Sequence, residues 1–576
     1  MPGRGTGFYG LFERLREGQY GRKARPGDGG IAMITFDTDP GRWRHWRLHC
    51  EGAVATLVLD VAEEGGVRPD YRLKLNSYDL GVDIELLDAL DRIRFEHPQV
   101  RVVVVTGGKE RVFCSGANIY MLAQASHAEK VDFCRFTNET RNAIEDISRH
   151  GGIKFIAAVN GACAGGGYEL ALACDEILMV DDRSTTLSLP EVALLGVLPG
   201  TGGLTRLTDK RKVRRDLADV FATSAEGVRA DRALAWKLVD HIAPPAGFAA
   251  LVAARARALA ADSDHPTEVE GIALPPLDRR GEAEGWRYRR VAVRLARAER
   301  RATITVTGPE RADVPDGLAG ILAAGANWWP LAVARELDDA LLLLRANEHE
   351  IGTLILETRG DPALVLAGDA VIAAHRDHWF VRAALGVLRR SLRRLDLCGK
   401  SLVALVDEGS CFAGSLFELA LAADRSYMLM GGEAPSAIAL GPLQFGGLEM
   451  ANGRTRLETR FNDEAAAAAL APSEGRLLDA AAAQQLGLVT FAPDELDWAD
   501  EIRLALEERA SLSPDALAGL EANLRFAGPE TLATRIAGRL SAWQNWVFLR
   551  PNAAGAEGAL KSYGSGKRPR FDWERI

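Results

Sequence analysis

The segment best suited to chemistry is rich in glycine and runs from Ala158 to Asp175, with the sequence AVNGACAGGGYELALACD. A strand pattern ends here, three glycines follow, and a helical pattern begins, so the backbone can approach a ligand closely. The free N–H groups at such a helix start point toward the ligand, with the positive end of the helix dipole behind them. This arrangement suits either a phosphate or a negative charge that develops on an oxygen atom.

The usual phosphate-binding patterns are missing from this segment. No Lys-Ser/Thr pair follows the glycines as in a P-loop, and the spacing is not the G-x-G-x-x-G of dinucleotide-binding proteins. The other use of converging N–H groups is an oxyanion hole, which stabilises an enolate as it forms. The structural alternative is that the glycines only permit close packing of a strand against a helix. The glycines alone leave both interpretations open.

The chain contains an internal repeat of about 250 residues, and the glycine-rich segment lies within its first copy. Residues 85–90 (ELLDAL) match residues 336–341 (ELDDAL), and residues 164–175 match residues 413–424 (AGSLFELALAAD). The offsets between matching positions stay between 245 and 251 residues. Such a constant long offset predicts two copies of one structural unit in tandem.

Each copy alternates short β-branched runs with amphipathic stretches of helical length. In the first copy, residues 55–60, 102–105 and 155–159 are predicted strands, and residues 83–96 and 128–149 are predicted helices. This alternation predicts an α/β fold with a parallel sheet. The predicted domains are a disordered or extended tail (1–42), the first copy (43–261), a linker (262–285), the second copy (286–495) and a helical region (496–576). The alternative for the tail is an over-extended gene start, with Met33 as the true start.

Composition excludes several classes of function. The chain has 576 residues, 47% hydrophobic and 26% charged, with a net charge of −9, so no global positive field attracts nucleic acid or membrane. No apolar run approaches the ~18 residues of a membrane span. The seven cysteines show neither a disulfide framework nor a metal-binding pattern. We therefore expect a soluble, cytoplasmic protein without a metal.

Three motifs in order resemble the crotonase, or enoyl-CoA hydratase/isomerase, superfamily. The first is Gly165–Glu169 (GGGYE), and the second is Ser115–Asn118 (SGAN). The third is Pro190-Glu191 followed by residues 196–207 (GVLPGTGGLTRL). The resemblance is clear over residues 43–260 and weak in the second copy. It implies tandem crotonase-like ββα-repeat units, the second one degenerate, followed by C-terminal helices.

The resemblance also implies roles for individual residues. The N–H groups of Ala117 and Gly166 would form the oxyanion hole for an acyl-CoA thioester, and Glu169 and Glu191 would be the catalytic acid and base. Two carboxylates around one reacting carbon can divide this work, because burial and mutual repulsion separate their pKa values. No cofactor is implied, since CoA enters as part of the substrate.

Several further residues are weaker candidates for substrate contacts. Arg72 and Lys74 could bind the 3′-phosphate of CoA, and Gly165 borders the predicted hole. Asn118 stands where the family commonly has aspartate. Cys134, in a helical stretch that borders the acyl pocket in crotonases, could assist a late hydrolytic step, or it is a small buried hydrophobic residue.

The second copy lacks most of these groups. Ser415 and Leu416 replace Gly166 and Gly167, and Pro435-Ser436 replaces Pro190-Glu191, while Glu418 still matches Glu169. We therefore expect residues 286–495 to be a structural scaffold that packs against the first copy and has no catalytic role.

The doubled length narrows the resemblance to double-length crotonase relatives of aerobic benzoate degradation. It implies ring-opening hydrolysis of 2,3-epoxybenzoyl-CoA to 3,4-dehydroadipyl-CoA semialdehyde and formate, with no nucleic-acid or membrane partner. The alternatives are an enoyl-CoA hydratase or isomerase acting on an aliphatic chain, and a non-catalytic acyl-CoA-binding protein. Trp543, Trp546 and Phe548 in the final helical region favour a homodimer.

Overall fold

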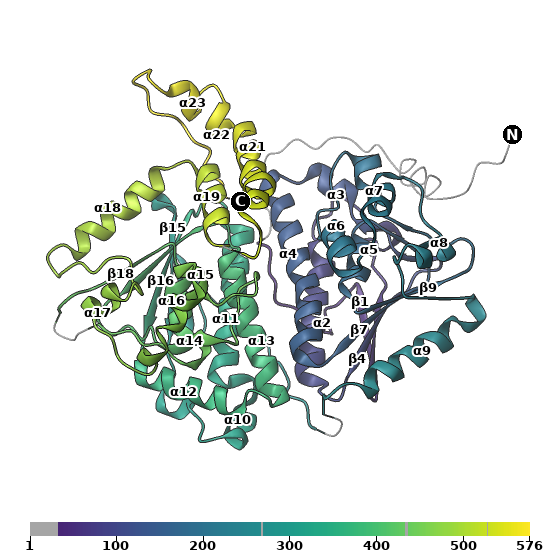
Figure 1. The fold of residues 1–576 in the computed structure, drawn as a ribbon, viewed down its shortest axis with the longest axis horizontal. Helices are drawn as coiled ribbons and strands as arrows, with labels where there is room; N and C mark the ends of the chain where they lie inside the picture. The colour runs from purple at the N-terminus through teal and green to yellow at the C-terminus, as the bar shows by residue number, and fades with distance from the viewer. Residues whose placement is uncertain (1–32, 267–268, 433–435, 527, 576) are drawn as a thin grey trace. The chain divides into compact units, whose positions relative to one another are not determined.

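The computed structural model describes residues 33–266, 269–432, 436–526 and 528–575. These residues form two compact units, one made mainly of residues 37–276 and the other of residues 34–36 with 277–576 (Figure 1). Among the described residues, no helix is both long and apolar enough to cross a membrane. Each unit is an α/β structure with its own sheet and helices, and each is described below by itself.

The first unit is built on a six-stranded sheet with the order β1-β2-β4-β7-β9-β11. Only β1 and β2 pair antiparallel, and the other neighbours are parallel. The strands are β1 (Trp46–Glu51), β2 (Val54–Leu59), β4 (Val102–Gly107), β7 (Lys154–Val159), β9 (Glu176–Val180) and β11 (His241–Ala243). The predicted parallel sheet and its three predicted strands are thereby confirmed.

Two smaller sheets of the first unit carry the motif segments. One has the order β10-β8-β5, and the other pairs β3 with β6. Their strands are β3 (Ser77–Tyr78), β5 (Val112–Cys114), β6 (Gly116–Ala117), β8 (Ala162–Ala164) and β10 (Leu187–Ser188). All these pairs are parallel, so the chain leaves β5, β8 and β10 of the first small sheet in similar directions. The segments after β8 and β10, which carry Gly165 and Glu191, therefore begin side by side.

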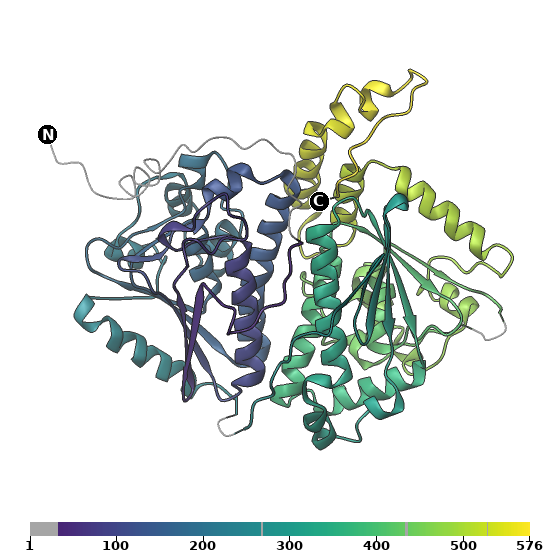
Figure 2. The same ribbon diagram turned by 180° about the vertical axis from the view of Figure 1, so that it is seen from behind.

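Helices cover the sheets of the first unit (Figures 1 and 2). They include α2 (Leu80–Glu96), α4 (His127–Asp146), α5 (Gly166–Ala173) and α9 (Pro245–Ala261). The side chain of Asp79 starts α2 by accepting hydrogen bonds from the N–H groups of Gly81 and Val82. Ala256 and Ala260 of α9 join a buried apolar cluster with sheet residues such as Val104 and Ile156, so α9 closes one face of the main sheet.

The second unit is built on a seven-stranded sheet whose strands follow one another from β12 to β18. The first four strands pair antiparallel, and β15 to β18 are parallel. They are β12 (Arg280–Glu282), β13 (Gly285–Arg287), β14 (Val291–Ala296), β15 (Arg301–Thr307), β16 (Thr353–Arg359), β17 (Ser401–Val406) and β18 (Arg425–Met428). Strand β12 lies inside the segment expected to be a linker, because its pairing with β13 is a backbone interaction that its polar sequence does not signal.

The helices of the second unit include α11 (Trp329–Asn347), α12 (Pro362–His375), α13 (Trp379–Asp396), α14 (Gly414–Ala422), α18 (Trp498–Ser511), α19 (Pro514–Leu524) and α21 (Ser541–Leu549). The helical pattern expected after residue 496 is confirmed. The expected N-terminal tail lies outside the described residues up to position 32. Ile34 is held by Asn347 of α11 through two hydrogen bonds of 2.8 and 3.0 Å, so this part of the expected tail is ordered.

Candidate active site

The loop of the first unit requires glycine at these positions, both because its backbone conformation favours glycine and because neighbouring atoms leave no room for a side chain. Gly165 has a φ of +54° and precedes α5, a conformation that favours glycine. A Cβ atom at Gly165 would lie 2.7 Å from Oε1 of Glu191, and one at Gly166 would overlap the hydroxyl of Tyr78. A Cβ at Gly167 would instead overlap the carbonyl of Cys114. Gly167 therefore serves strand–helix packing, whereas Gly165 and Gly166 face polar side chains.

The two predicted oxyanion-hole donors come from neighbouring pieces of backbone. Gly166 is the first residue of α5, where N–H groups have no acceptor within the helix. Ala117 ends β6, and a Cβ built on the preceding Gly116 would lie only 2.8 Å from the nitrogen of Gly166. The positive φ of Gly116, +87°, permits this approach. The fold thus brings the Ala117 turn and the start of α5 together.

Glu169 is deeply buried, with 2% of its surface exposed. Its Oε1 accepts hydrogen bonds from the N–H groups of Thr201 at 3.0 Å and Gly203 at 2.7 Å, and its Oε2 accepts one from the Thr201 hydroxyl. Burial raises the pKa of Glu169, while these hydrogen bonds act in the opposite direction. The loop that follows Gly196 is therefore what orients this carboxyl group.

Glu191 occupies a very different environment from Glu169. It begins a short helical turn, Glu191–Leu195, directly after Pro190. Its Oε2 is buried and has no hydrogen-bond partner among the described residues. Burial and the nearby charge of Glu169 raise the pKa of Glu191 to about 8. At neutral pH this shift favours the protonated form of Glu191, and the two carboxyl groups of the site have unlike surroundings.

Tyr78 is a site residue that the sequence did not single out. It lies on β3, is 2% exposed, and its hydroxyl reaches the start of α5 at Gly166. The guanidinium of Arg141 lies 5.2 Å from the centre of its ring and forms a buried ion pair with Asp83. No motif spacing links these residues. Tyr78 is 88 positions from Gly166, and Asp83 and Arg141 lie on separate helices, α2 and α4.

Cys134 lies near the site, but its thiol is a poor base. Its sulfur is 3.7 Å from where a Cβ of Gly200 would be, beside the loop that holds Glu169. Burial and the charge of Glu169 raise the pKa of Cys134 to about 11. The thiol therefore stays protonated at neutral pH, which favours the interpretation of a packing residue, although Cys134 is half-buried and not fully buried.

Two of the weaker substrate-binding candidates, Asn118 and Arg72, have other partners. The side chain of Asn118 caps α3 (Ile119–Gln124) by accepting from the N–H of Met121 at 2.9 Å, and it donates to the carbonyl of Arg72 at 2.8 Å. Arg72 is exposed and its side chain is paired with Glu64. Lys74 lies in a short 3-10 turn, Lys74–Asn76. Asn118 thus has a structural role that explains why an amide replaces the common aspartate.

The equivalent loop of the second unit is occupied by the chain itself. The N–H of Ser415, which the repeat aligns with Gly166, donates to Oδ2 of Asp369 on α12. Asp369 is 1% exposed, and burial raises its pKa to about 7. Glu418 is also buried, where it accepts hydrogen bonds from Arg456 at 2.8 Å and Gln444 at 3.0 Å. Pro435 lies outside the described residues.

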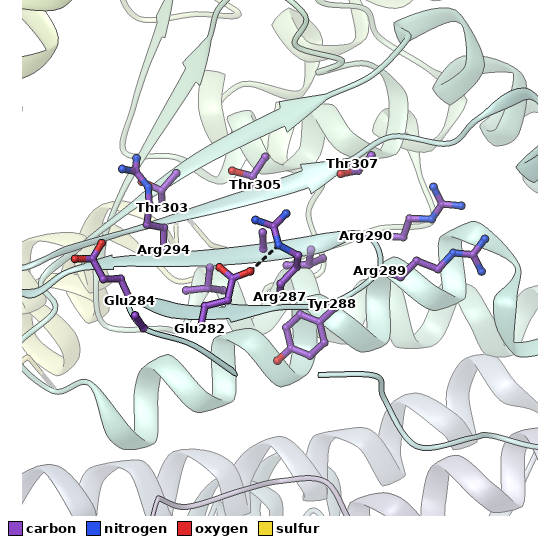
Figure 3. A pocket seen from close by; sticks show the side chains of 14 residues that line it. Glu282, Glu284, Arg287, Tyr288, Arg289, Arg290, Arg294, Thr303, Thr305 and Thr307 are labelled. Carbon is purple, nitrogen blue, oxygen red and sulfur yellow. Dashed lines mark hydrogen bonds and ion pairs between the residues drawn. The ribbon is translucent and has the colours of Figure 1, made fainter. Parts of the chain in front are cut away.

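A cavity of the second unit lies elsewhere, on the sheet face formed by β12 to β15 (Figure 3). It has a volume of about 520 Å³ and is lined largely by arginine and threonine side chains. Arg287 is hydrogen-bonded to Glu282 at 2.8 Å, and Arg290 is paired with Asp313 at 2.7 Å. These two cations are neutralised locally, and Glu282 and Glu284 also line the cavity. No cluster of His, Cys, Asp or Glu that could hold a metal occurs in the described parts of the chain.

The site of the first unit thus combines a glycine loop at the start of α5, the nearby end of β6, the buried carboxyl group of Glu169 and the half-buried one of Glu191. The model of the enoyl-CoA hydratase/isomerase family matches residues 68–271. The chain belongs to this family and is an enzyme of the crotonase superfamily.

Its similarity extends over almost the whole chain for one curated relative. Benzoyl-CoA-dihydrodiol lyase of Aromatoleum evansii is 57% identical over 545 residues, which cover 94% of this chain and 98% of that protein. The fatty acid oxidation complex subunit alpha of Shewanella loihica is 35% identical over 195 residues, 34% of this chain and 25% of that one. An enoyl-CoA hydratase structure from Bacillus anthracis is 27% identical with a TM-score of 0.33, covering 38% of this chain and 78% of that one.

Proposed function

We propose that this enzyme opens the ring of 2,3-epoxybenzoyl-CoA by hydrolysis and releases 3,4-dehydroadipyl-CoA semialdehyde and formate. Two water molecules are consumed, which balances the atoms. The observation that carries the proposal is the pair of unlike carboxyl groups, Glu169 and Glu191, around the start of α5. The 57% identity to a benzoyl-CoA-dihydrodiol lyase over 94% of the chain supports an aromatic thioester as the substrate.

In the proposed mechanism, backbone and carboxyl groups divide the work. The thioester carbonyl accepts hydrogen bonds from the N–H groups of Ala117 and Gly166 and withdraws electrons from the ring. Glu191, protonated at neutral pH with a pKa of about 8, donates its proton to the epoxide oxygen as the C–O bond breaks. Glu169, oriented by Thr201 and Gly203, takes a proton from the attacking water. A second hydrolysis then breaks a ring C–C bond and releases one carbon as formate.

The direct test compares two substrates on the purified protein. With 2,3-epoxybenzoyl-CoA we expect one formate for each thioester consumed, and with crotonyl-CoA we expect no hydration. The rival function, hydration of an aliphatic enoyl-CoA, is favoured by the family match over residues 68–271 and predicts the reverse. A non-catalytic acyl-CoA-binding protein would give neither product.

We further propose that the second unit is a degenerate copy without a catalytic role. The repeat in the sequence supports this, as does the parallel order of β15 to β18. The contacts of its loop also support it, because the carboxylate of Asp369 takes the N–H of Ser415. A thioester oxygen would have to displace a buried carboxylate there.

Glu418→Gln tests the role of the second unit. We expect turnover to stay within about twofold of wild type, as for a substitution outside the active site. The melting temperature should fall by about 3 °C or more, because Arg456 loses a charged partner in a buried ion pair. Asp396, 2.6 Å from Arg456, limits the loss. The control is Glu474→Gln, an exposed position of the same unit. A variant of normal stability without activity would place chemistry in the second unit.

A homodimer and a cytoplasmic location are also proposed. Leu532 of α20 (Leu532–Thr534) and Phe548 and Leu549 of α21 are at least half exposed. Exposed apolar groups of this size favour burial against another protein surface. Sedimentation equilibrium should give twice the chain mass, and a monomer at micromolar concentration would refute the homodimer.

A further inference from the structure

The hydroxyl group of Tyr78 is buried without a partner. Its oxygen makes no hydrogen bond to any described residue, although the side chain is only 2% exposed. Buried hydroxyl groups are normally satisfied, because an unpaired one costs free energy relative to its bonds with water. This hydroxyl lies against the α-carbon of Gly166, so it stands beside the first N–H group of α5.

The surroundings of Tyr78 fix its ring in this position. The ring of Phe133 packs at 5.8 Å between centroids, and the guanidinium of Arg141 lies 5.2 Å from the ring centre. Arg141 is itself held by the carboxylate of Asp83, which also accepts a hydrogen bond of 2.6 Å from the Thr137 hydroxyl. A cation over the ring makes the phenol a stronger hydrogen-bond donor. Burial raises the pKa of Tyr78, so the hydroxyl keeps its proton.

A second buried polar atom without a hydrogen-bond partner belongs to Glu191, whose side chain lies against Gly165, the glycine next to Gly166. Oε2 of Glu191 has no hydrogen bond to the described residues, and Oε1 of the same group lies against Gly165. Tyr78 and Glu191 thus lie against two consecutive glycines of the loop, and each has a buried polar atom without a hydrogen-bond partner among the described residues. This indicates that a bound molecule supplies the missing hydrogen bonds to both. Glu191 is the proton donor in the proposed mechanism, whereas Tyr78 has no part in that mechanism.

We propose that Tyr78 is a specificity-determining residue, whose hydroxyl donates a hydrogen bond to the oxygen on the ring carbon next to the thioester-bearing carbon. This inference rests on the proposed function, because it places the thioester carbonyl on the N–H of Gly166. The adjacent ring carbon is two bonds from that carbonyl carbon, so an oxygen there falls beside the same loop. An aliphatic thioester without such an oxygen leaves the hydroxyl buried and unpaired, which disfavours it.

A binding experiment tests this inference without requiring turnover. We compare 2-hydroxybenzoyl-CoA, which carries an oxygen on that carbon, with benzoyl-CoA, which does not. Wild-type protein should bind the 2-hydroxy compound at least ~5-fold more tightly, and Tyr78→Phe should remove this preference. Benzoyl-CoA should bind the variant within about twofold of wild type, since it makes no bond to the hydroxyl. For the same reason, kcat/KM of Tyr78→Phe for 2,3-epoxybenzoyl-CoA should fall at least ~10-fold.

Tyr168→Phe is the matched control. Tyr168 is equally buried, and its hydroxyl donates to the carbonyl of Leu238 at 2.8 Å. Removing it should lower the melting temperature and leave the ligand preference unchanged, whereas Tyr78→Phe should not lower the melting temperature. A preference that persists in Tyr78→Phe, or is absent from wild type, overturns the inference. The proposed function fails by a different result, namely wild-type protein that releases no formate from 2,3-epoxybenzoyl-CoA.

Discussion

Glu191→Gln should lower turnover of 2,3-epoxybenzoyl-CoA by at least ~100-fold, the usual worth of a general acid or base. Glutamine keeps the size and hydrogen-bonding capacity of the side chain but cannot give up a proton. Glu169→Gln should have an effect of the same size, because its amide cannot accept a proton from water. Binding of benzoyl-CoA should change little, since the backbone N–H groups remain in place. Steady-state rates and a binding titration measure both quantities.

The control for these variants is Glu226→Gln, an exposed glutamate of the same unit. It should behave as wild type in both measurements. The dependence of kcat/KM on pH gives a second check on Glu191. With a pKa raised to about 8, the acid form predominates below pH 8 and is lost above it. Activity should therefore decline above about pH 8, and Glu191→Gln should remove that decline. Near-normal turnover in either active-site variant would exclude its residue from the mechanism.

Gly166→Leu should abolish turnover, with a loss of at least ~100-fold. A side chain at this position overlaps the hydroxyl of Tyr78, so it displaces the start of α5 and fills the space beneath the thioester. Both effects move the N–H group away from the developing oxyanion. The measurement is the rate of formate release, together with the affinity for benzoyl-CoA.

Two other glycine variants separate a lost site from a lost fold. Gly247→Leu, on the outer part of α9, meets its nearest neighbours at ordinary contact distance of 3.9 Å and should keep activity. Gly167→Leu meets the backbone of Cys114 and should lower the melting temperature strongly. If Gly166→Leu turned over normally, Gly166 would not be an oxyanion donor.

Much of the first unit could be predicted from its sequence. The strands at β2, β4 and β7 have continuous apolar runs, and the helix predicted over residues 83–96 forms as α2, which begins three residues earlier at Leu80. The pairing of Glu169 with Glu191 was an expectation of the family resemblance, and in the structure the parallel strands β8 and β10 lead into the two segments that carry them. Strand β12 could not be predicted, since its residues, Arg280–Glu282, are all exposed and form no apolar strand pattern.

The parts of the site that escaped prediction depend on contacts between distant residues. Tyr78 reaches Gly166 across 88 positions, and its neighbours Asp83 and Arg141 resemble ordinary charged residues of amphipathic helices. Asn118 suggested a substrate contact, but its amide is used by Met121 and Arg72. Asp369 lies on a helix that the repeat did not highlight, so its bond to Ser415 was not visible in the sequence.

The bond between Asp369 and Ser415 places a side chain of the second unit itself where a ligand oxygen is proposed to bind in the first unit. The Asp369 carboxyl group is tethered to α12, and its Oδ2 accepts the N–H of Ser415 at the start of α14, as the proposed mechanism has a thioester oxygen accept the N–H of Gly166. A tethered group has a high effective concentration and does not dissociate into solvent. If the first unit binds acyl-CoA as proposed, free acyl-CoA should stabilise that unit by mass action. The bond between Asp369 and Ser415 is instead part of the folded second unit, so its contribution should not depend on ligand concentration.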